Sequence, residues 1–231
     1  MTAELDLGRK AGAEFIGTAF LVTAVIGSGI AAQRLSPDDV GLQLLENSLA
    51  TGAALVALIL ALQPVSAAFN PVVTLVERAL GQIGNRVTAV LVAAQFVGGF
   101  VGAVLANLMF DLDAIELAGN DRTGGGLLLG EVVATFGLVL LVFGSLRAGR
   151  GDVVAFTVGG YIAAAYWFTS STSFANPAVT VARMFSDTFA GIEPSSVPGF
   201  VGMQLVGGAL AFVAVRFLYP STTRTTEGAA R

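Results

Sequence analysis

The stretch that decides the fold is Asn-Pro-Val-Val-Thr at residues 70–74, which returns as Asn-Pro-Ala-Val-Thr at residues 176–180. In each copy the Asn-Pro pair takes the 24th and 25th positions of an uncharged run of 30 residues, 47–76 and 153–182. A helix of that length would measure roughly 45 Å, whereas the hydrocarbon core of a bilayer is about 30 Å thick. Proline suits the first turn of a helix, and asparagine is a preferred N-cap. Each run is therefore predicted to hold a full span, a turn at membrane depth and a short helix that begins at the proline.

Four further runs are long enough to cross a bilayer, and only one of them contains a charged residue, Glu131. The sequence thus predicts an all-α integral membrane protein with six transmembrane helices. Two re-entrant half-helices, near 70–80 and 176–187, complete the expected fold. The four runs are 15–33, 87–110, 123–146 and 194–215.

The composition of the 231 residues agrees with a membrane protein. Hydrophobic residues make up 55%, charged residues 12%, and the mean hydropathy is +0.79. Soluble domains carry about 25% charged residues. The net charge of −4 argues against nucleic acid as a partner. The chain has no Cys and no His, which excludes disulfides, Cys/His zinc sites and Ser-His-Asp triads. We expect no enzyme activity, no cofactor and no metal.

The distribution of basic residues predicts the orientation in the membrane. With the N-terminus inside, nine of the twelve Lys and Arg residues fall in cytoplasmic segments, and only Arg34, Arg122 and Arg183 fall outside. The positive-inside rule then places both termini in the cytoplasm of a multi-pass protein of the cell (inner) membrane.

The two halves of the chain, about 11–110 and 127–218, resemble each other. Because each half has three spans, the second must enter the membrane from the opposite face, which makes an inverted repeat. Residues 1–231 are interpreted as one membrane channel domain, with a disordered tail predicted at 220–231. The matching pairs are, in order, Glu14 with Glu131, Asn70 with Asn176, and Gln95 with Gln204.

An inverted repeat would bring the two half-helices together end to end near the midplane of the bilayer. Their positive dipole ends would then face each other, and Asn70 and Asn176 would add side-chain donors at the same height. A cation or a proton meets a barrier there, whereas a neutral polar molecule does not. The pattern favours a selective pore.

These features resemble the aquaporin and aquaglyceroporin family, the major intrinsic proteins, over roughly residues 11–218. The resemblance implies an hourglass fold in the lipid bilayer, a pore in each subunit, a homotetramer, and passive conduction of water or small neutral solutes. It also implies a central constriction, in which Val72 replaces the usual Ala. The constriction residues would be Asn70, Pro71, Val72, Asn176, Pro177 and Ala178.

The outer selectivity filter departs from the family pattern. The family usually has Arg three residues after the second asparagine, and here that position is Val179. Family spacing places the other filter positions at Thr51, Ala164 and Ser173. A small filter without a fixed cation should pass glycerol, urea or undissociated metalloid acids such as arsenite. The stretch 166–183 is similar to bacterial members associated with arsenic resistance.

Arg183 is the one cation expected near the outer mouth, and two interpretations stay open. It could supply a displaced, looser filter, or it could form a surface ion pair with Asp187 one helical turn later. Tyr166, Trp167 and Phe168 are assigned to an aromatic belt at the membrane surface.

Glu14 and Glu131 are carboxylates inside spans, and such groups are functional by default. The family resemblance implies that each holds a re-entrant loop through its backbone. The alternative is a proton-coupled secondary transporter that uses the two carboxylates. An intramembrane enzyme and an adhesion or structural protein are further classes that the pattern leaves open.

Overall fold

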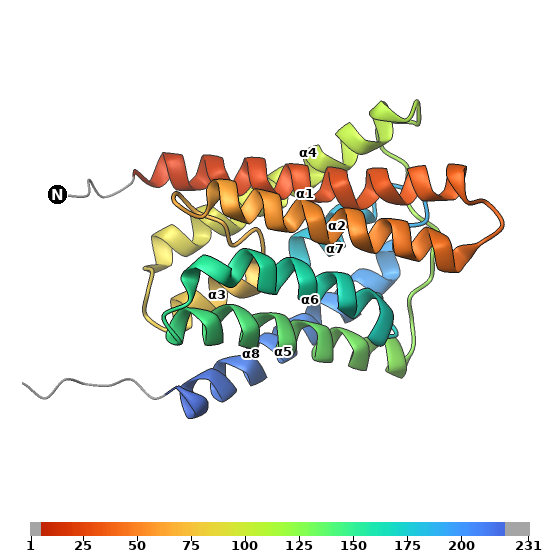
Figure 1. Cartoon of the computed structure of the whole chain (residues 1–231). Helices are drawn as coiled ribbons and strands as arrows, with labels where there is room; N and C mark the ends of the chain where they lie inside the picture. Colours follow the sequence, from red (N-terminus) through yellow and green to blue (C-terminus); the bar gives the residue numbers. More distant parts are fainter. Residues whose placement is uncertain (1–5, 220–231) are drawn as a thin grey trace, which may run out of the picture.

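The computed structural model describes residues 6–219, so the tail predicted at 220–231 lies outside the described residues. The described chain is built of helices joined by turns and loops (Figure 1). The helices are α1 (Leu7–Leu35), α2 (Val40–Leu62), α3 (Pro71–Ala79), α4 (Asn85–Met109), α5 (Gly125–Arg147), α6 (Val154–Phe168), α7 (Pro177–Arg183) and α8 (Val197–Leu218), with short 3-10 turns η1 (Gly151–Val153) and η2 (Pro194–Ser196).

Five helices are each long and apolar enough to cross a membrane: α1, α2, α4, α5, and α8 together with η2. The sixth spanning element, α6, has 15 residues, which corresponds to roughly 23 Å of helix. It follows η1 directly, so the spanning stretch is somewhat longer than the α-helix itself. The protein is therefore an integral membrane protein with the six predicted spans.

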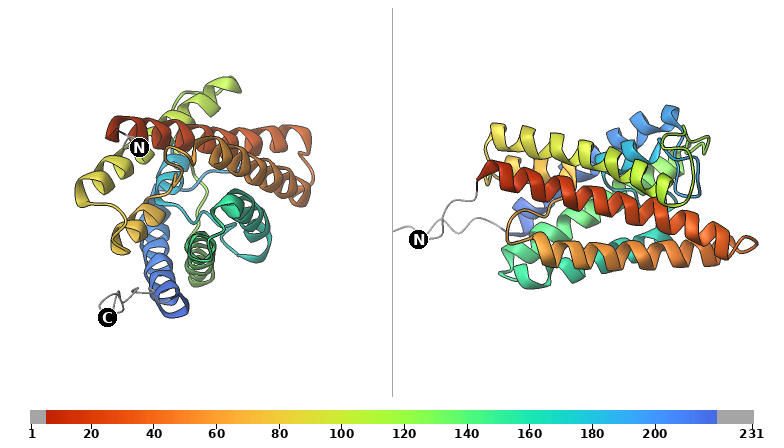
Figure 2. Two further views of the ribbon diagram at one scale, coloured as in Figure 1. Left: turned by 60° about the vertical axis from the view of Figure 1, so that its left-hand side comes forward. Right: turned by 90° about the horizontal axis from the view of Figure 1, so that it is seen from above.

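The two halves of the chain have matching helix packing, and their short helices contact long helices of both halves. In each half the first and last long helices pack on each other, α1 on α4 and α5 on α8 (Figure 2). The short helices α3 and α7 lie between the halves, and each contacts both α4 and α8. The first turn of α1 and the last turn of α8 lie at the same end of the molecule (Figure 1). The inverted arrangement predicted from the sequence is confirmed.

Both short helices begin as predicted, at a proline behind an asparagine cap. The Oδ1 atom of Asn70 accepts from Val72 N at 2.9 Å, and that of Asn176 accepts from Ala178 N at 3.0 Å. The predicted end of the second half-helix is wrong, because α7 stops at Arg183 rather than at residue 187. Bonds between residues three apart tighten its last turn, and the chain then leaves the helix.

Glycines let the long helices of each half approach closely. A Cβ atom at Gly98 of α4 would overlap the carbonyl of Phe15 in α1, and one at Gly207 of α8 would lie 2.6 Å from the carbonyl of Val132 in α5. These carbonyls belong to helix backbones and cannot rotate away. Small residues at such crossings are typical of membrane helix packing.

We expect Gly98→Ala to lower stability by about 1–3 kcal/mol, as overpacking of a rigid interface usually does. The measurement is the thermal unfolding midpoint of the detergent-solubilised protein. Gly160→Ala is the matched control, because a Cβ atom at Gly160 meets nothing within 4 Å. Equal midpoints for the two variants would contradict the proposed close contact.

Candidate functional site

Two buried carboxylates hold the loops that precede the half-helices. Glu14 accepts the backbone N–H groups of residues 68 and 69 at 2.8 and 2.7 Å. Glu131 accepts those of residues 174 and 175, both at 2.9 Å. Both carboxylates are fully buried. The loop residues Phe69 and Ala175 have positive φ, a conformation that non-glycine residues adopt only where the surroundings impose it.

A glutamine on the last helix of each half completes this anchor. Gln95 Nε2 donates to Glu14 at 2.8 Å and to Thr74 Oγ1 at 2.9 Å. Gln204 Nε2 likewise donates to Glu131 at 2.6 Å and to Thr180 Oγ1 at 2.8 Å. Each carboxylate therefore joins a loop, a half-helix and a spanning helix. In the described chain neither Glu14 nor Glu131 lines a cavity of the pore.

The two half-helices meet through a reciprocal exchange of hydrogen bonds. Asn70 Nδ2 donates to the carbonyl of Ala175 at 2.8 Å, and Asn176 Nδ2 donates to the carbonyl of Phe69 at 2.7 Å. Each amide oxygen is occupied in capping its own helix, so the amide orientation is fixed. An amide nitrogen carries two N–H groups. Because both asparagines line a cavity, the second N–H can serve a passing solute.

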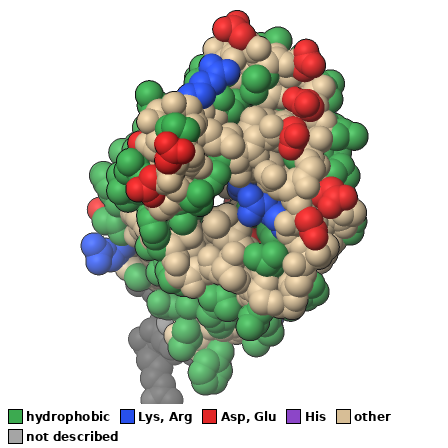
Figure 3. All heavy atoms as spheres, turned by 90° about the vertical axis from the view of Figure 1, so that its right-hand side faces the viewer, with side chains coloured by type: hydrophobic (Ala, Val, Ile, Leu, Met, Phe, Trp, Pro, Cys, Tyr) green, Lys and Arg blue, Asp and Glu red, His purple; other side chains and the backbone are tan. Residues whose placement is uncertain are grey.

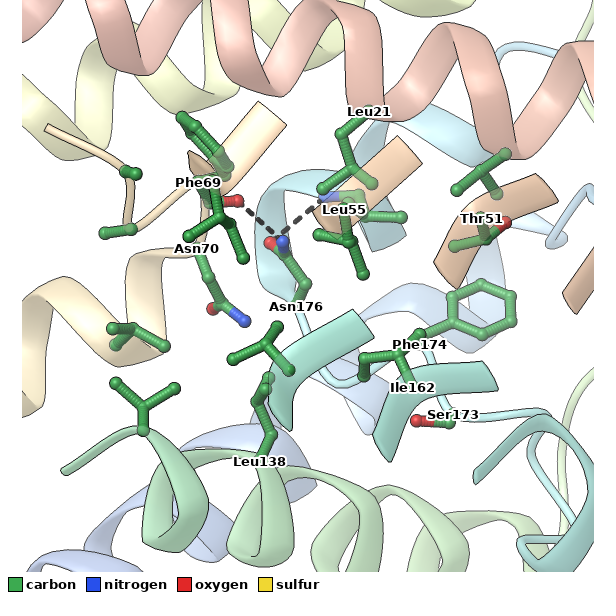
Figure 4. Close-up of a pocket in the computed structure, with 18 of the residues that line it drawn as sticks. Leu21, Thr51, Leu55, Phe69, Asn70, Leu138, Ile162, Ser173, Phe174 and Asn176 are labelled. Carbon is green, nitrogen blue, oxygen red and sulfur yellow. Dashed lines mark hydrogen bonds between the residues drawn. The ribbon is translucent and has the colours of Figure 1, made fainter. Parts of the chain in front are cut away.

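A cavity passes these asparagines (Figure 4). One side of its wall is apolar and comes from the long helices, whereas the loops before α3 and α7 supply the other side. A second cavity opens beyond it and shares six lining residues with it. The apolar wall includes Leu21, Val25, Leu55, Ile59, Leu138, Val142, Val158 and Ile162.

Hydroxyl groups gather at the other end of the first cavity. Thr51 of α2, Tyr166 of α6 and Ser173 of the following loop all line it, together with Val179 of α7. The Thr51 Oγ1 and Tyr166 OH atoms lie 3.3 Å apart, within hydrogen-bonding distance. The Ser173 Oγ atom is buried without a hydrogen-bond partner in the described structure.

The assignment of Ala164 to the filter is corrected by the structure. Ala164 is exposed on the outside of α6, whereas residues 158, 162 and 166 form the row that faces the cavity. Two residues along a helix turn the side chain by about 200°, so Ala164 points away from that row. The prediction that Tyr166 lies in the surface belt is wrong, because Tyr166 is 4% exposed and lines the cavity. Its i, i+4 spacing from Ile162 is the signal that could have revealed it.

The six residues predicted for the central constriction divide into two groups. Asn70 and Asn176 line the cavity, whereas in the described chain the other four do not. A Cβ atom at Gly208 would overlap Val72, so the side chain of Val72 packs against α8. The other non-lining residues are Pro71, Pro177 and Ala178, all of them buried.

Arg183 lies in the wall of the cavity and not on the surface. It is 2% exposed, its Nε donates to the carbonyl of Ala190, and its Cζ lies 3.4 Å from the ring centroid of Phe174. Asp187 instead accepts from Gly119 N at 3.0 Å. The interpretation of Arg183 as a partner of Asp187 in a surface ion pair is therefore wrong. Because α7 ends at Arg183, Asp187 does not lie one helical turn beyond it.

The face of the molecule on the side of the α1–α2 corner is hollowed, with basic side chains beside an opening and acidic side chains around it (Figure 3). A hollow on this side, lined by residues of the loops around α5 and α7 and of the α1–α2 corner, includes Gln33, Asn120 and Arg122. The hollow and the buried half-helices together define the class of the protein: an α-helical membrane protein with an internal cavity, built from inverted repeats.

Comparison with known proteins names the family. The family model "Major intrinsic protein" matches residues 1–173. The chain is 49% identical over 216 residues to aquaglyceroporin AqpS of Rhizobium meliloti, covering 93% of this chain and 92% of that protein. It is 30% identical to aquaporin-5 of Rattus norvegicus, covering 91% and 81%. The solved aquaglyceroporin of Plasmodium falciparum shares the fold, with a TM-score of 0.68, 19% identity, and coverage of 90% of this chain and 95% of that one.

The chain therefore belongs to the major intrinsic protein family. It is a channel for water and small solutes and not an enzyme.

Proposed function

We propose that this protein conducts small neutral solutes larger than water, such as glycerol, urea and undissociated metalloid acids including arsenite, down their gradients. The observation that carries the proposal is the outer end of the pore. There Val179 lies where the family usually has arginine, and the hydroxyl-bearing residues Thr51, Tyr166 and Ser173 line the same cavity. A solute with several hydroxyl groups can exchange hydrogen bonds with them while its carbon side meets the apolar wall.

Arg183 is the displaced cation of this filter. Its Nε donates to the carbonyl of Ala190, and one face of the guanidinium is covered by the ring of Phe174. The remaining N–H groups of the guanidinium can then donate to a solute in the cavity that Arg183 lines. A displaced guanidinium leaves room beside Val179. The similarity to a protein named aquaglyceroporin supports a solute class that includes glycerol.

The proton-coupled transporter is the weaker alternative. Glu14 and Glu131 are each committed to two backbone N–H groups and one glutamine amide, and within residues 6–219 neither lines the cavities of the pore. A proton carrier needs contact with the solute path, and that contact is lacking in the described structure.

Flux into proteoliposomes tests the proposal directly. Stopped-flow light scattering under gradients of water, glycerol, urea and arsenite should give rates that rise linearly with the gradient and do not depend on pH. Saturable, proton-dependent uptake would point to the transporter instead. A protein that conducts water and excludes glycerol and urea would overturn the proposed solute class.

We expect Arg183→Ala to raise the ratio of glycerol to water permeability by about two- to tenfold, the range that corresponds to one altered hydrogen-bonding group. Removing the guanidinium widens the outer end of the cavity. The measurement is the pair of rates in the same vesicles, which makes the ratio independent of the amount of protein. Unchanged selectivity would remove Arg183 from the filter.

The assembly and the orientation belong to the same proposal. A homotetramer in the inner membrane, with both termini in the cytoplasm, fits the exposed apolar faces of the long helices and the distribution of basic residues. Crosslinking in native membranes and protease access from each side test these two points.

A further inference from the structure

Arg122, in the loop between α4 and α5, is bound from several sides at the outer end of the molecule. Its Nε donates to the carbonyl of Gly191 at 2.9 Å, and its Nη2 donates to that of Phe189 at 3.4 Å. Its Cζ lies 4.9 Å from the ring centroid of Phe174, and its backbone N–H donates to Ser196 Oγ at 3.0 Å. One side chain thus joins the segment before α5, the loop before α7 and the segment between α7 and α8.

Arg183 and Arg122 donate hydrogen bonds to neighbouring backbone carbonyls of the same segment, residues 189–191. Arg122 binds the carbonyls of residues 189 and 191, and Arg183 binds the carbonyl of residue 190. Both guanidinium groups also lie over the ring of Phe174. Two cations this close repel each other, so their positions depend on the ring face and the carbonyl oxygens that stabilise them.

We propose that Arg122 is a positioning residue of the outer filter. It fixes the segment 189–191 and the ring of Phe174, and these two elements set the place of the Arg183 guanidinium in the pore wall. This inference rests on the proposed function, since it assumes that solutes pass Arg183. In the described structure Arg122 lines the outer hollow and not the cavity of Arg183, so its effect reaches solutes through the shared partners.

The contacts of Arg122 require a guanidinium. A planar group can donate from one edge to two carbonyls while its face covers an aromatic ring. An ammonium group keeps the charge but is a compact point donor without such a face. Burial lowers the pKa of Arg122 from its ordinary value, because it removes the charged guanidinium from water. Lysine should therefore fail to replace it.

The test compares the ratio of glycerol to water permeability in proteoliposomes. We expect Arg122→Gln and Arg122→Lys each to raise this ratio by about threefold, because Arg183 is no longer held in place. The matched control is Arg34→Gln. Arg34 also donates to a carbonyl, that of Phe110 at 2.6 Å, and lies over the ring of the same residue with its Cζ 5.2 Å from the centroid. It lies outside the described pore lining, so its loss should leave the ratio unchanged.

A double variant separates positioning from a general loosening of the structure. In the Arg183→Ala background, Arg122→Gln should add no further change in the ratio, because the residue it positions is gone. A wild-type ratio in Arg122→Gln, or an equal shift with and without Arg183, would overturn the positioning role. A wild-type protein that passes no glycerol would count against the proposed solute class, and the same comparison with the urea-to-water ratio would still test Arg122.

Discussion

Glu131→Ala is expected to cost the protein several kcal/mol of stability, roughly 3 kcal/mol or more, because it leaves buried donors without an acceptor. The carboxylate accepts the N–H groups of Phe174 and Ala175 and the Nε2 of Gln204. All three donors belong to buried residues, so water cannot take the place of the lost acceptor. The loop before α7 would then lose its positive-φ conformation, and with it the carbonyl of Ala175 that Asn70 binds.

The measurement is the fraction of detergent-solubilised protein that stays monodisperse and its unfolding midpoint. Glu116→Ala is the matched control, because Glu116 is an exposed carboxylate in the loop between α4 and α5. A Glu131→Ala protein that folds normally and has lost a pH-dependent uptake would refute the anchor and favour the transporter. The unfolding midpoint of Glu131→Gln should lie between those of Glu131→Ala and Glu116→Ala. The glutamine amide keeps one acceptor oxygen, but its own N–H groups face other donors.

The frame of the fold could be predicted from the sequence because it depends on local chemistry. The two Asn-Pro pairs determine where α3 and α7 begin, since proline lacks the N–H that the first turn would leave unpaired and asparagine caps that turn. The uncharged runs determine the spans. The matching order of Glu14 with Glu131 and of Gln95 with Gln204, together with the family resemblance, predicts a pair of loop anchors, and in the structure each carboxylate accepts two backbone hydrogen bonds from a loop.

The outer end of the pore could be predicted only in part, because it depends on an irregular segment. Between α6 and α7 the chain passes through positive φ at Thr172, Ser173 and Ala175. Counting residues back through such a loop does not preserve the rotational register of α6, so family spacing points to Ala164 whereas the structure places Tyr166 in the cavity lining. The end of α7 raises the same difficulty. Met184 and Phe185 follow Arg183, and neither is a residue that usually ends a helix, so the sequence carries no local signal for the end of α7.

Val179→Arg is expected to reduce glycerol flux at least about tenfold, which corresponds to about 1.4 kcal/mol of added barrier. Val179 lines the cavity, is 5% exposed and follows Asn176 by three residues. A longer side chain at this position can extend only into the cavity, because the backbone N–H of Val179 is held by Asn176 Oδ1 at 3.3 Å and α7 is buried on its other faces. Its charge would also lie one helical turn from that of Arg183.

Water should be affected less than glycerol, because a water molecule can pass a gap that a three-carbon solute cannot. The readout is therefore the change in both rates measured in the same vesicles. Val179→Met supplies the matched control, since methionine adds length and volume without charge. A fall in glycerol flux with Arg and Met alike would assign the effect to size, and a fall with Arg alone would assign it to the cation. Glycerol flux that survives Val179→Arg unchanged would mean that solutes do not pass the first turn of α7, and the outer filter would have to be sought elsewhere.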